Sequence, residues 1–189
     1  VFAFSFEGNP NLKPEESRSF ELGLKSNLSN SQSLSLNYFF YKIDNLIDFE
    51  GPTFKPVNIN EAKLKGIETA YNYQSNGLAI NINATIQEAK NSLTDSALLR
   101  RPDNKFNVTM DKTFKEWSLG SSIRYASKSP DFGVELDDYT VIDLRAAYRF
   151  NQNWKIGLKI DNVLNESYQL VDGYNTPKNS GYLTLEWQQ

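Results

Sequence analysis

The chain has 189 residues, of which 39% are hydrophobic and 23% are charged, and its formal net charge is −3. This acidic balance excludes the basic surface typical of a nucleic-acid-binding protein, so we expect no nucleic-acid partner. The sequence contains no histidine and no cysteine. Without them, serine–histidine catalysis, imidazole and thiolate metal ligands and disulfides are excluded, and we expect neither an enzyme nor a bound cofactor.

Alternating apolar and polar residues predict about nine β-strands and no helix, because successive side chains of a strand project to opposite faces. The segment "LAININATIQ" shows the pattern most clearly, with Ile80 and Ile82 on one face and Asn81 and Asn83 on the other. In chain order, the expected strands lie within residues 19–26, 33–42, 66–74, 78–87, 105–112, 117–126, 141–150, 154–161 and 181–187.

The connections between these strands alternate in length. Short turns rich in Asn, Ser and Gly alternate with long polar segments. The short turns lie at 27–32, 74–77, 113–117 and 150–154, and the long segments at 48–63, 88–104, 127–139 and 162–180. One end of the sheet is therefore predicted to carry short turns and the other long loops, which is the layout of a bacterial outer-membrane barrel.

The apolar face of these strands has two explanations, because a soluble antiparallel sandwich also alternates. Two features favour contact with lipid. Several predicted strands have about ten residues, which suits a tilted membrane-spanning strand better than an ordinary strand of about five or six. The aromatic residues of the apolar face gather at the short-turn end, as interfacial girdles do. They are Tyr73, Trp117, Phe150, Trp154 and Trp187.

The opposite face of the predicted sheet is polar and charged, with Glu68, Arg145 and Lys159 among its residues. A wide lumen, filled with water or with another domain, accommodates such residues better than a narrow barrel does. Each of these charges taken alone is more simply explained as a solvated or paired wall residue.

Several longer motifs resemble TonB-dependent outer-membrane receptors. They are "NPNLKPEESRSFELGL", "YKIDNLIDF", "NINEAKLKGIE", "SALLRRPDNKF" and "IDNVLNESYQLVDGYNTP". Their order and spacing are similar to the C-terminal part of the barrel in the vitamin B12 (cobalamin) receptor branch. The resemblance implies an all-β fold, an antiparallel transmembrane β-barrel portion with about nine strands of a 22-stranded plugged barrel. Residues 1–189 would form its C-terminal segment, without the plug domain and the early strands.

The same resemblance implies a location in the Gram-negative cell outer membrane, as a multi-pass β-barrel in contact with outer-membrane lipid. The protein would import cobalamin, or another metal chelate if it belongs to the alternative siderophore branch. Energy would come from the TonB–ExbB–ExbD complex, acting through the missing N-terminal part. Cobalamin would be the transported substrate and not a cofactor.

By this resemblance the long loops form the mouth that receives the substrate. Tyr174, in "GYNTP", matches a cobalamin-contacting tyrosine of the family, and Asp131 and Phe132, in "SPDF", fall near a contacting pair. Arg100 and Asp95, in "TDSALLRR", are candidate lumen or substrate-side residues. Simpler roles stay open: Tyr174 as a rim aromatic, Arg100 in an ion pair with the plug or wall, and Asp95 as a turn residue.

Two other classes of protein also stay open. An outer-membrane lipase or protease would need other chemistry than serine and histidine, and the carboxylates of Asp137 and Asp138 fit a solvated turn better than a catalytic pair. A soluble adhesive sandwich is the non-membrane alternative.

Overall fold

A computed structural model of the chain describes residues 8–50 and 55–189. Nine strands form one antiparallel sheet in the order β1-β2-β3-β4-β5-β6-β9-β10-β11, and β7 and β8 form a separate two-stranded hairpin. The strands are β1 (Glu16–Ser29), β2 (Gln32–Glu50), β3 (Lys55–Ser75), β4 (Leu78–Asn91), β5 (Asn104–Phe114), β6 (Trp117–Ala126), β7 (Ser129–Asp131), β8 (Val134–Leu136), β9 (Tyr139–Arg149), β10 (Trp154–Asp161) and β11 (Ser180–Trp187). Among the described residues no helix is long and apolar enough to cross a membrane. The predicted all-β antiparallel fold is confirmed.

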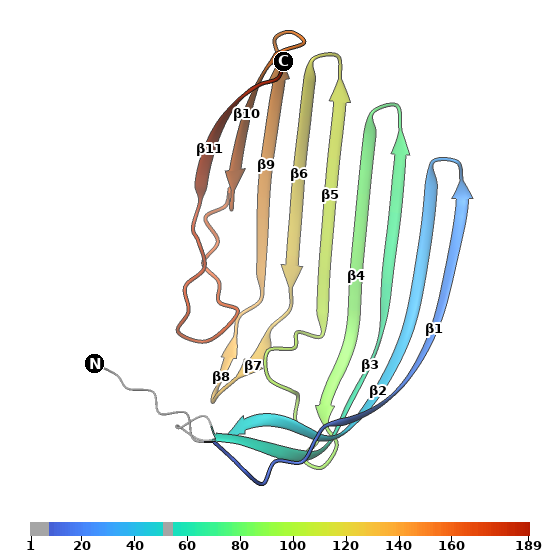
Figure 1. Ribbon diagram of the computed structural model, residues 1–189, viewed down its shortest axis with the longest axis vertical. Helices are drawn as coiled ribbons and strands as arrows, with labels where there is room; N and C mark the ends of the chain where they lie inside the picture. Colours follow the sequence, from blue (N-terminus) through green and yellow to red (C-terminus); the bar gives the residue numbers. More distant parts are fainter. Residues whose placement is uncertain (1–7, 51–54) are drawn as a thin grey trace.

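The two ends of the sheet differ as the connection lengths predict. Figure 1 shows the short turns at one end of the sheet and the long connections at the other. The β3–β4 turn illustrates how the sequence builds the short end. Asn76 and Gly77 both have positive φ, 49° and 71°, which is the backbone of a tight hairpin turn whose twist matches that of the strands.

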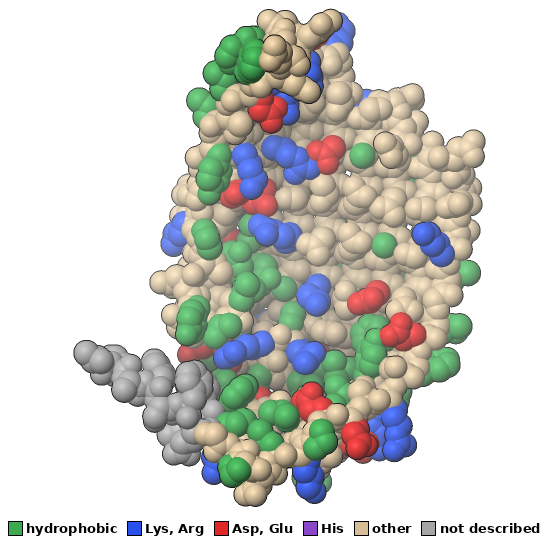
Figure 2. All heavy atoms as spheres, viewed as in Figure 1, with side chains coloured by type: hydrophobic (Ala, Val, Ile, Leu, Met, Phe, Trp, Pro, Cys, Tyr) green, Lys and Arg blue, Asp and Glu red, His purple; other side chains and the backbone are tan. Residues whose placement is uncertain are grey.

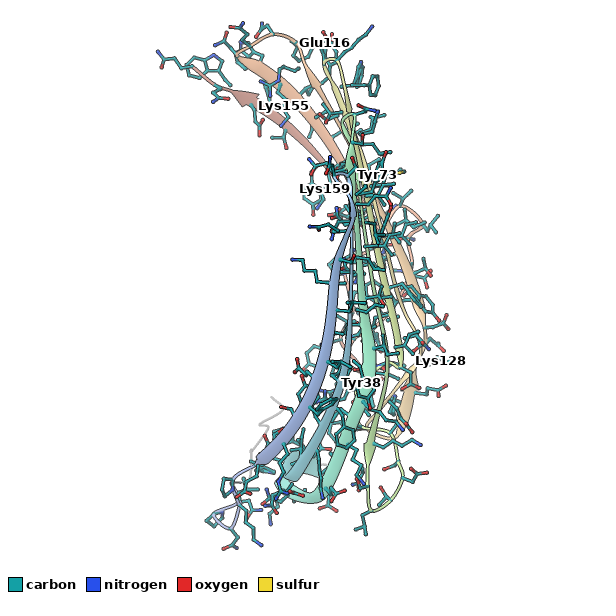
Figure 3. The ribbon with its side chains drawn as sticks, turned by 90° about the vertical axis from the view of Figure 1, so that its right-hand side faces the viewer. Tyr38, Tyr73, Glu116, Lys128, Lys155 and Lys159 are labelled. Carbon is teal, nitrogen blue, oxygen red and sulfur yellow. The ribbon has the colours of Figure 1, made fainter. Side chains whose placement is uncertain are left out.

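The large sheet is curved, and its two faces have different chemistry. In Figure 3, Lys155 and Lys159 point to the concave side and Tyr73 lies on the convex side. Charged and other polar side chains occupy much of the concave face in Figure 2. The convex face exposes large apolar side chains, among them Phe20, Leu22, Leu24, Ile67, Ile86, Leu144, Leu158, Leu183 and Leu185. An apolar face that protein leaves uncovered, opposite a polar concave face, is what a membrane barrel wall requires.

Aromatic side chains mark the short-turn end of the convex face. The Trp117 and Tyr148 rings lie 4.7 Å apart, and Phe150 meets Tyr148 edge-on at 5.2 Å. Trp154 stands opposite Trp187 in the register of β10 and β11. This arrangement has the form of an interfacial girdle. In the described part of the chain no second sheet covers the apolar face, so the soluble-sandwich alternative finds no support.

A small protein core lies on the concave side near the long-loop end. It consists of Phe39, Ala62, Leu64, Ala89 and Leu98. Leu98 belongs to the connection between β4 and β5, so this loop folds back over the inner surface of the sheet. Its backbone N–H donates to the carbonyl of Ala89 at 2.9 Å, which fixes the loop against β4.

The prediction of a long loop at 48–63 is wrong. Strands β2 and β3 continue through most of this segment, and their register runs on to the pair Glu50 and Lys55. Beyond the apolar band, the convex face carries ion pairs in place of apolar contacts: Lys42 lies 2.7 Å from Glu61, and Lys63 lies 3.0 Å from the same carboxylate. These ion pairs interrupt the apolar alternation on the convex face, although the strands persist.

Candidate ligand-binding site

The long-loop end brings four segments together: the outer part of the β2–β3 hairpin, the loop 92–103, the β7–β8 hairpin, and the loop 162–179. The β2–β3 hairpin bends inward, and Asn45 within β2 has a φ of 56°. Figure 1 shows this hairpin turning across the lower end of the sheet, near the β7–β8 hairpin. The candidate site residues all lie in these loops, as loops on a rigid scaffold commonly carry binding function.

Asp131, at the end of β7, joins three of these segments. Its side chain is fully enclosed, with 0% relative exposure. One carboxylate oxygen accepts hydrogen bonds from Arg100 Nε at 2.8 Å and from the Phe132 N–H at 2.9 Å. The other accepts the Asp172 N–H at 2.8 Å. We refer to Asp131 with Arg100, Phe132 and Asp172 as the loop clamp.

The electrostatics of the loop clamp favour a charged carboxylate. Burial of Asp131 acts to raise the pKa of its carboxyl group. The hydrogen bonds from the Asp172 backbone, Arg100 and the Phe132 backbone outweigh burial, and the pKa lies below its usual value of 3.8. Three donors around one buried carboxylate explain this direction, since they stabilise its ionised form.

Arg100 is held by its backbone as well as by its side chain. It has a positive φ of 58°, and its N–H donates to the carbonyl of Pro130 at 2.7 Å. Its guanidinium lies 5.4 Å from the centre of the Phe132 ring, within the range of a cation–π contact. Arg100 therefore forms one cluster with Asp131 and Phe132, which the sequence analysis singled out as a pair.

Tyr174 projects from a turn of the loop 162–179 and is 73% exposed. Its N–H donates to the carbonyl of Val171 at 3.1 Å, and Gly173, which precedes it, has a φ of 77°. The same turn contains Asp172, whose N–H enters the loop clamp. The exposed ring is thus presented by a short turn that Asp131 anchors.

Asp95 lies apart from this cluster. Its side chain is 86% exposed and 3.3 Å from Lys90, and its backbone has a φ of 56°. It borders a hollow on the convex side together with Phe40 and Lys65. The structure therefore does not bring Asp95 together with Arg100, Asp131 or Tyr174, and its geometry is that of a turn residue.

Asn162 anchors the base of the loop 162–179, and the sequence analysis did not single it out. It is 3% exposed, and its N–H donates to Asp143 Oδ1 at 2.9 Å. Its side chain forms two hydrogen bonds with the backbone of Glu166: Nδ2 donates to the carbonyl and Oδ1 accepts from the N–H, each at 2.8 Å. The "DN" that ends the alternating run could have indicated the end of the strand here, because Asn tolerates the positive φ of 51° that this position has.

A pocket of about 310 Å³ lies between the β2–β3 hairpin, the loop 92–103 and the β7–β8 turn, and we call it the loop pocket. Ile59, Leu98 and Phe132 are among its lining residues, together with Asp48, Phe49 and Glu50 at the end of β2. Glu50 stands opposite Lys55 in the register of β2 and β3. Asp131 also borders it, so the loop clamp forms part of its wall. Within the described residues, no group of His, Cys, Asp or Glu side chains is arranged to hold a metal ion.

Several charged residues of the concave wall form ion pairs. Arg145 of β9 reaches across β6 to Asp111 of β5, with its Nε 3.0 Å from the carboxylate. Gly120 of β6 lies between them, and a β-carbon there would come within 2.5 Å of Asp111 Oδ1. The glycine therefore leaves room for this ion pair to cross the strand, and a larger residue would displace the two side chains.

Residues 2–163 match the model of the "TonB dependent receptor-like, beta-barrel" family. The chain belongs to this family. Members are β-barrel proteins of the Gram-negative outer membrane, so the expected class of protein is confirmed. The resemblance read from the sequence motifs is thereby supported at the level of the family.

Curated relatives include the vitamin B12 transporter BtuB of Photobacterium profundum, 29% identical over 191 residues, which cover 96% of this chain and 31% of the relative. The vitamin B12 transporter BtuB of Vibrio vulnificus is 28% identical over 86% of this chain and 27% of its own length. The chain thus spans about a third of the length of the curated relatives it matches.

Solved structures of the same fold include the copper transporter OprC, with a TM-score of 0.79 and 20% identity over 94% of this chain and 32% of that one. The pyoverdine receptor FpvA from Pseudomonas aeruginosa has a TM-score of 0.80 at 18% identity, over 100% of this chain and 32% of that one. At these identities the likeness concerns the fold.

Proposed function

We propose that this chain is part of an outer-membrane receptor that imports vitamin B12 (cobalamin) or a related corrinoid by transport energised through TonB. The observation that carries the proposal is the match over 96% of the chain to relatives named vitamin B12 transporters. The loops support it chemically. They present an exposed aromatic ring at Tyr174 and a pocket lined by polar and apolar residues, with hydrogen-bond acceptors among them. A large ligand with an amide-bearing rim suits such a surface.

The proposal assigns different tasks to the parts of the fold. The loops at the long-loop end capture the ligand outside the cell, with Tyr174 in contact and the loop clamp holding the surrounding backbone. The polar concave wall lines the lumen. Outer-membrane lipid surrounds the convex face. The TonB–ExbB–ExbD complex supplies energy through a part of the protein outside these residues.

The open sheet supports the view that these residues form only one portion of a barrel. Strands β1 and β11 are the two edges of the nine-stranded sheet, and neither pairs with the other. Unpaired strand edges are not tolerated in the hydrocarbon of a membrane. We therefore propose that further strands close the wall and that a plug domain fills the lumen, as in a barrel of about 22 strands.

Binding to whole cells tests the ligand. The full-length receptor is expressed in a Gram-negative strain that lacks its own B12 receptor, and uptake of radiolabelled cyanocobalamin is measured with and without TonB. We expect saturable binding in both strains and accumulation only in the strain with TonB. Absence of saturable cyanocobalamin binding, together with uptake of a ferric siderophore, would place the protein in the siderophore branch instead.

A further inference from the structure

A pocket of about 320 Å³ lies against the concave face at the base of the loop 162–179, and we call it the wall pocket. Lys159, Asp161, Ser180 and Tyr182 are among its lining residues. Lys159 stands opposite Tyr182 and Asp161 opposite Ser180 in the register of β10 and β11, so all four side chains share one face of the sheet. Figure 3 shows that this is the concave side, to which Lys159 points. No residue of the loop clamp lines the wall pocket.

The two carboxylates that line the wall pocket differ in how far their hydrogen bonds are satisfied. Asp143 accepts from Arg124 at 3.0 Å on one oxygen and from the Asn162 N–H at 2.9 Å on the other. Asp161 accepts from Lys159 through Oδ2, at 2.9 Å. Its Oδ1 is buried and has no hydrogen-bond partner among the described residues. Because folded proteins rarely leave a buried acceptor unpaired, a bound group that donates a hydrogen bond would complete this carboxylate.

The cations of the wall pocket are neutralised to different degrees. Arg124 is paired with Asp143, and Lys159 with Asp161. Lys178, near the end of the loop 162–179, lines the same pocket and forms no ion pair within the part of the chain that the structure describes. The lining therefore carries one more positive than negative charge. An anionic oxygen beside a hydrogen-bond donor is the group that such a lining suits.

The size of the wall pocket limits what can occupy it. At about 320 Å³ it lies at the lower end of the range for small-molecule sites, about 300–1,000 Å³, so it suits one arm of a corrinoid and not the ring system. The side-chain amides of cobalamin are neutral. The nucleotide arm joins ribose hydroxyl groups, which donate hydrogen bonds, to a phosphodiester, which is negatively charged. This arm therefore matches both the buried acceptor and the unpaired cation.

We infer that the wall pocket is a second ligand subsite, in which a ribose hydroxyl group of the nucleotide arm donates to Asp161 Oδ1 and the phosphodiester lies beside Lys178. This inference rests on the proposed function and adds to it a preference for complete corrinoids over those that lack the nucleotide. The pocket is organised before the ligand arrives. Asn162, which bonds both Asp143 and the backbone of Glu166, holds the base of the loop at the edge of the pocket.

The test compares two probes on the full-length receptor in detergent. The probes are cyanocobalamin and dicyanocobinamide, which lacks the nucleotide arm. The wild-type receptor should bind cyanocobalamin roughly ten- to hundredfold more tightly, because the arm forms hydrogen bonds with charged groups. Asp161→Asn should lower this ratio roughly tenfold, and Lys178→Gln roughly three- to fivefold, since Lys178 is exposed. Both variants should weaken the binding of cyanocobalamin and leave that of dicyanocobinamide unchanged.

Lys128→Gln is the matched control for Lys178→Gln. It removes the same charge at the same end of the sheet, but Lys128 lies outside the wall pocket and is paired with Glu135 and Asp137. The ratio should stay at its wild-type value in this variant. Added salt should lower the ratio in the wild type more than in Lys178→Gln, because salt screens the attraction between the phosphodiester and the ammonium group.

The possible outcomes separate the subsite from the receptor function. If the wild-type receptor binds both corrinoids equally tightly, the wall pocket holds only water, the subsite is overturned and the proposed function stands. If Asp161→Asn and Lys178→Gln weaken both corrinoids to the same extent, in receptors whose heat-resistant barrel mobility on gels is normal, the pocket does not recognise the nucleotide and the subsite is again overturned. If the wild-type receptor binds neither corrinoid, both proposals are overturned.

Discussion

Replacement of Asp131 by asparagine tests whether one carboxylate holds three loop segments together. The substitution keeps the size of the side chain and removes its charge. The amide oxygen can take the place of one carboxylate oxygen, but the amide nitrogen is a donor. If the amide oxygen faces Arg100 and Phe132, the nitrogen faces the N–H of Asp172, where a hydrogen bond of 2.8 Å is lost.

The size of the effect follows from that lost contact. A hydrogen bond to a charged group contributes about 1.5–3 kcal/mol, and the N–H of Asp172 is left without its acceptor. A local loss of about 2 kcal/mol raises the open population of the loop 162–179 roughly 30-fold. The ladder between β9 and β10 does not involve Asp131, so the sheet should keep its stability. Asp131→Ala, which frees all three donors, should have a larger effect.

Hydrogen exchange read by mass spectrometry on the full-length receptor measures this opening. Peptides covering residues 169–176 should exchange roughly 30-fold faster in Asp131→Asn than in the wild type, and peptides from β9 should be unchanged. Asp137→Asn, an exposed carboxylate paired with Lys128 at 3.3 Å, is the control and should have no effect. Unchanged exchange at 169–176 in both Asp131 variants would show that the carboxylate does not hold this loop.

Three further predictions follow from the faces, the mouth and the clamp. Arginine at Ile82, on the convex face, should cost about 2–4 kcal/mol of folding free energy in liposomes, whereas Asn81→Arg on the concave face should be mild; equal costs would contradict the lipid assignment. Tyr174→Ala should weaken cyanocobalamin binding roughly tenfold, while Tyr148→Ala on the convex face should leave it unchanged, as measured by equilibrium binding to cells. Because the pKa of Asp131 is lowered, the loop clamp should stabilise the loop 162–179 at neutral pH and lose this effect only as the pH falls below about 4. A spin label at Leu170→Cys should gain mobility below that pH. The same label in the Asp131→Asn variant should show no such transition.

The sheet could be predicted from the sequence because its signal is local. Within the apolar band, apolar and polar residues alternate along each strand. Ile80 and Ile82 show this alternation within a few residues. The same rule failed at 48–63, where Gly51, Pro52 and Pro56 favour a loop and charged residues replace apolar ones on the convex face. Strand pairing there depends on backbone hydrogen bonds and on ion pairs such as that between Lys42 and Glu61, which leave no periodic trace.

The candidate site could be predicted only in part. Motifs pointed to Tyr174, Asp131 and Arg100 one at a time, but not to their relation. Asp131 meets Arg100 across 31 residues of sequence and Asp172 across 41, and no local pattern encodes contacts of that span. The burial of Asp131 could not be predicted from the sequence either, because a carboxylate in a polar loop is normally expected to be solvated. Its position became apparent only when the loops were folded against one another.

The great length of strands β2 and β3 determines how accessible their outer ends are from outside the cell. Strands β2 and β3 have 19 and 21 residues, so at about 3.3 Å per residue each is roughly 60–70 Å long. A tilted strand needs only about 9–11 residues to cross the bilayer. About half of this hairpin therefore extends beyond the length that a membrane-spanning strand needs, on the side of the long loops. On living cells, antibodies should therefore reach the outer part of the β2–β3 hairpin more readily than most of these residues. The turn between Ser29 and Gln32 lies at the opposite end of the sheet, and antibodies should reach it only after the outer membrane is broken.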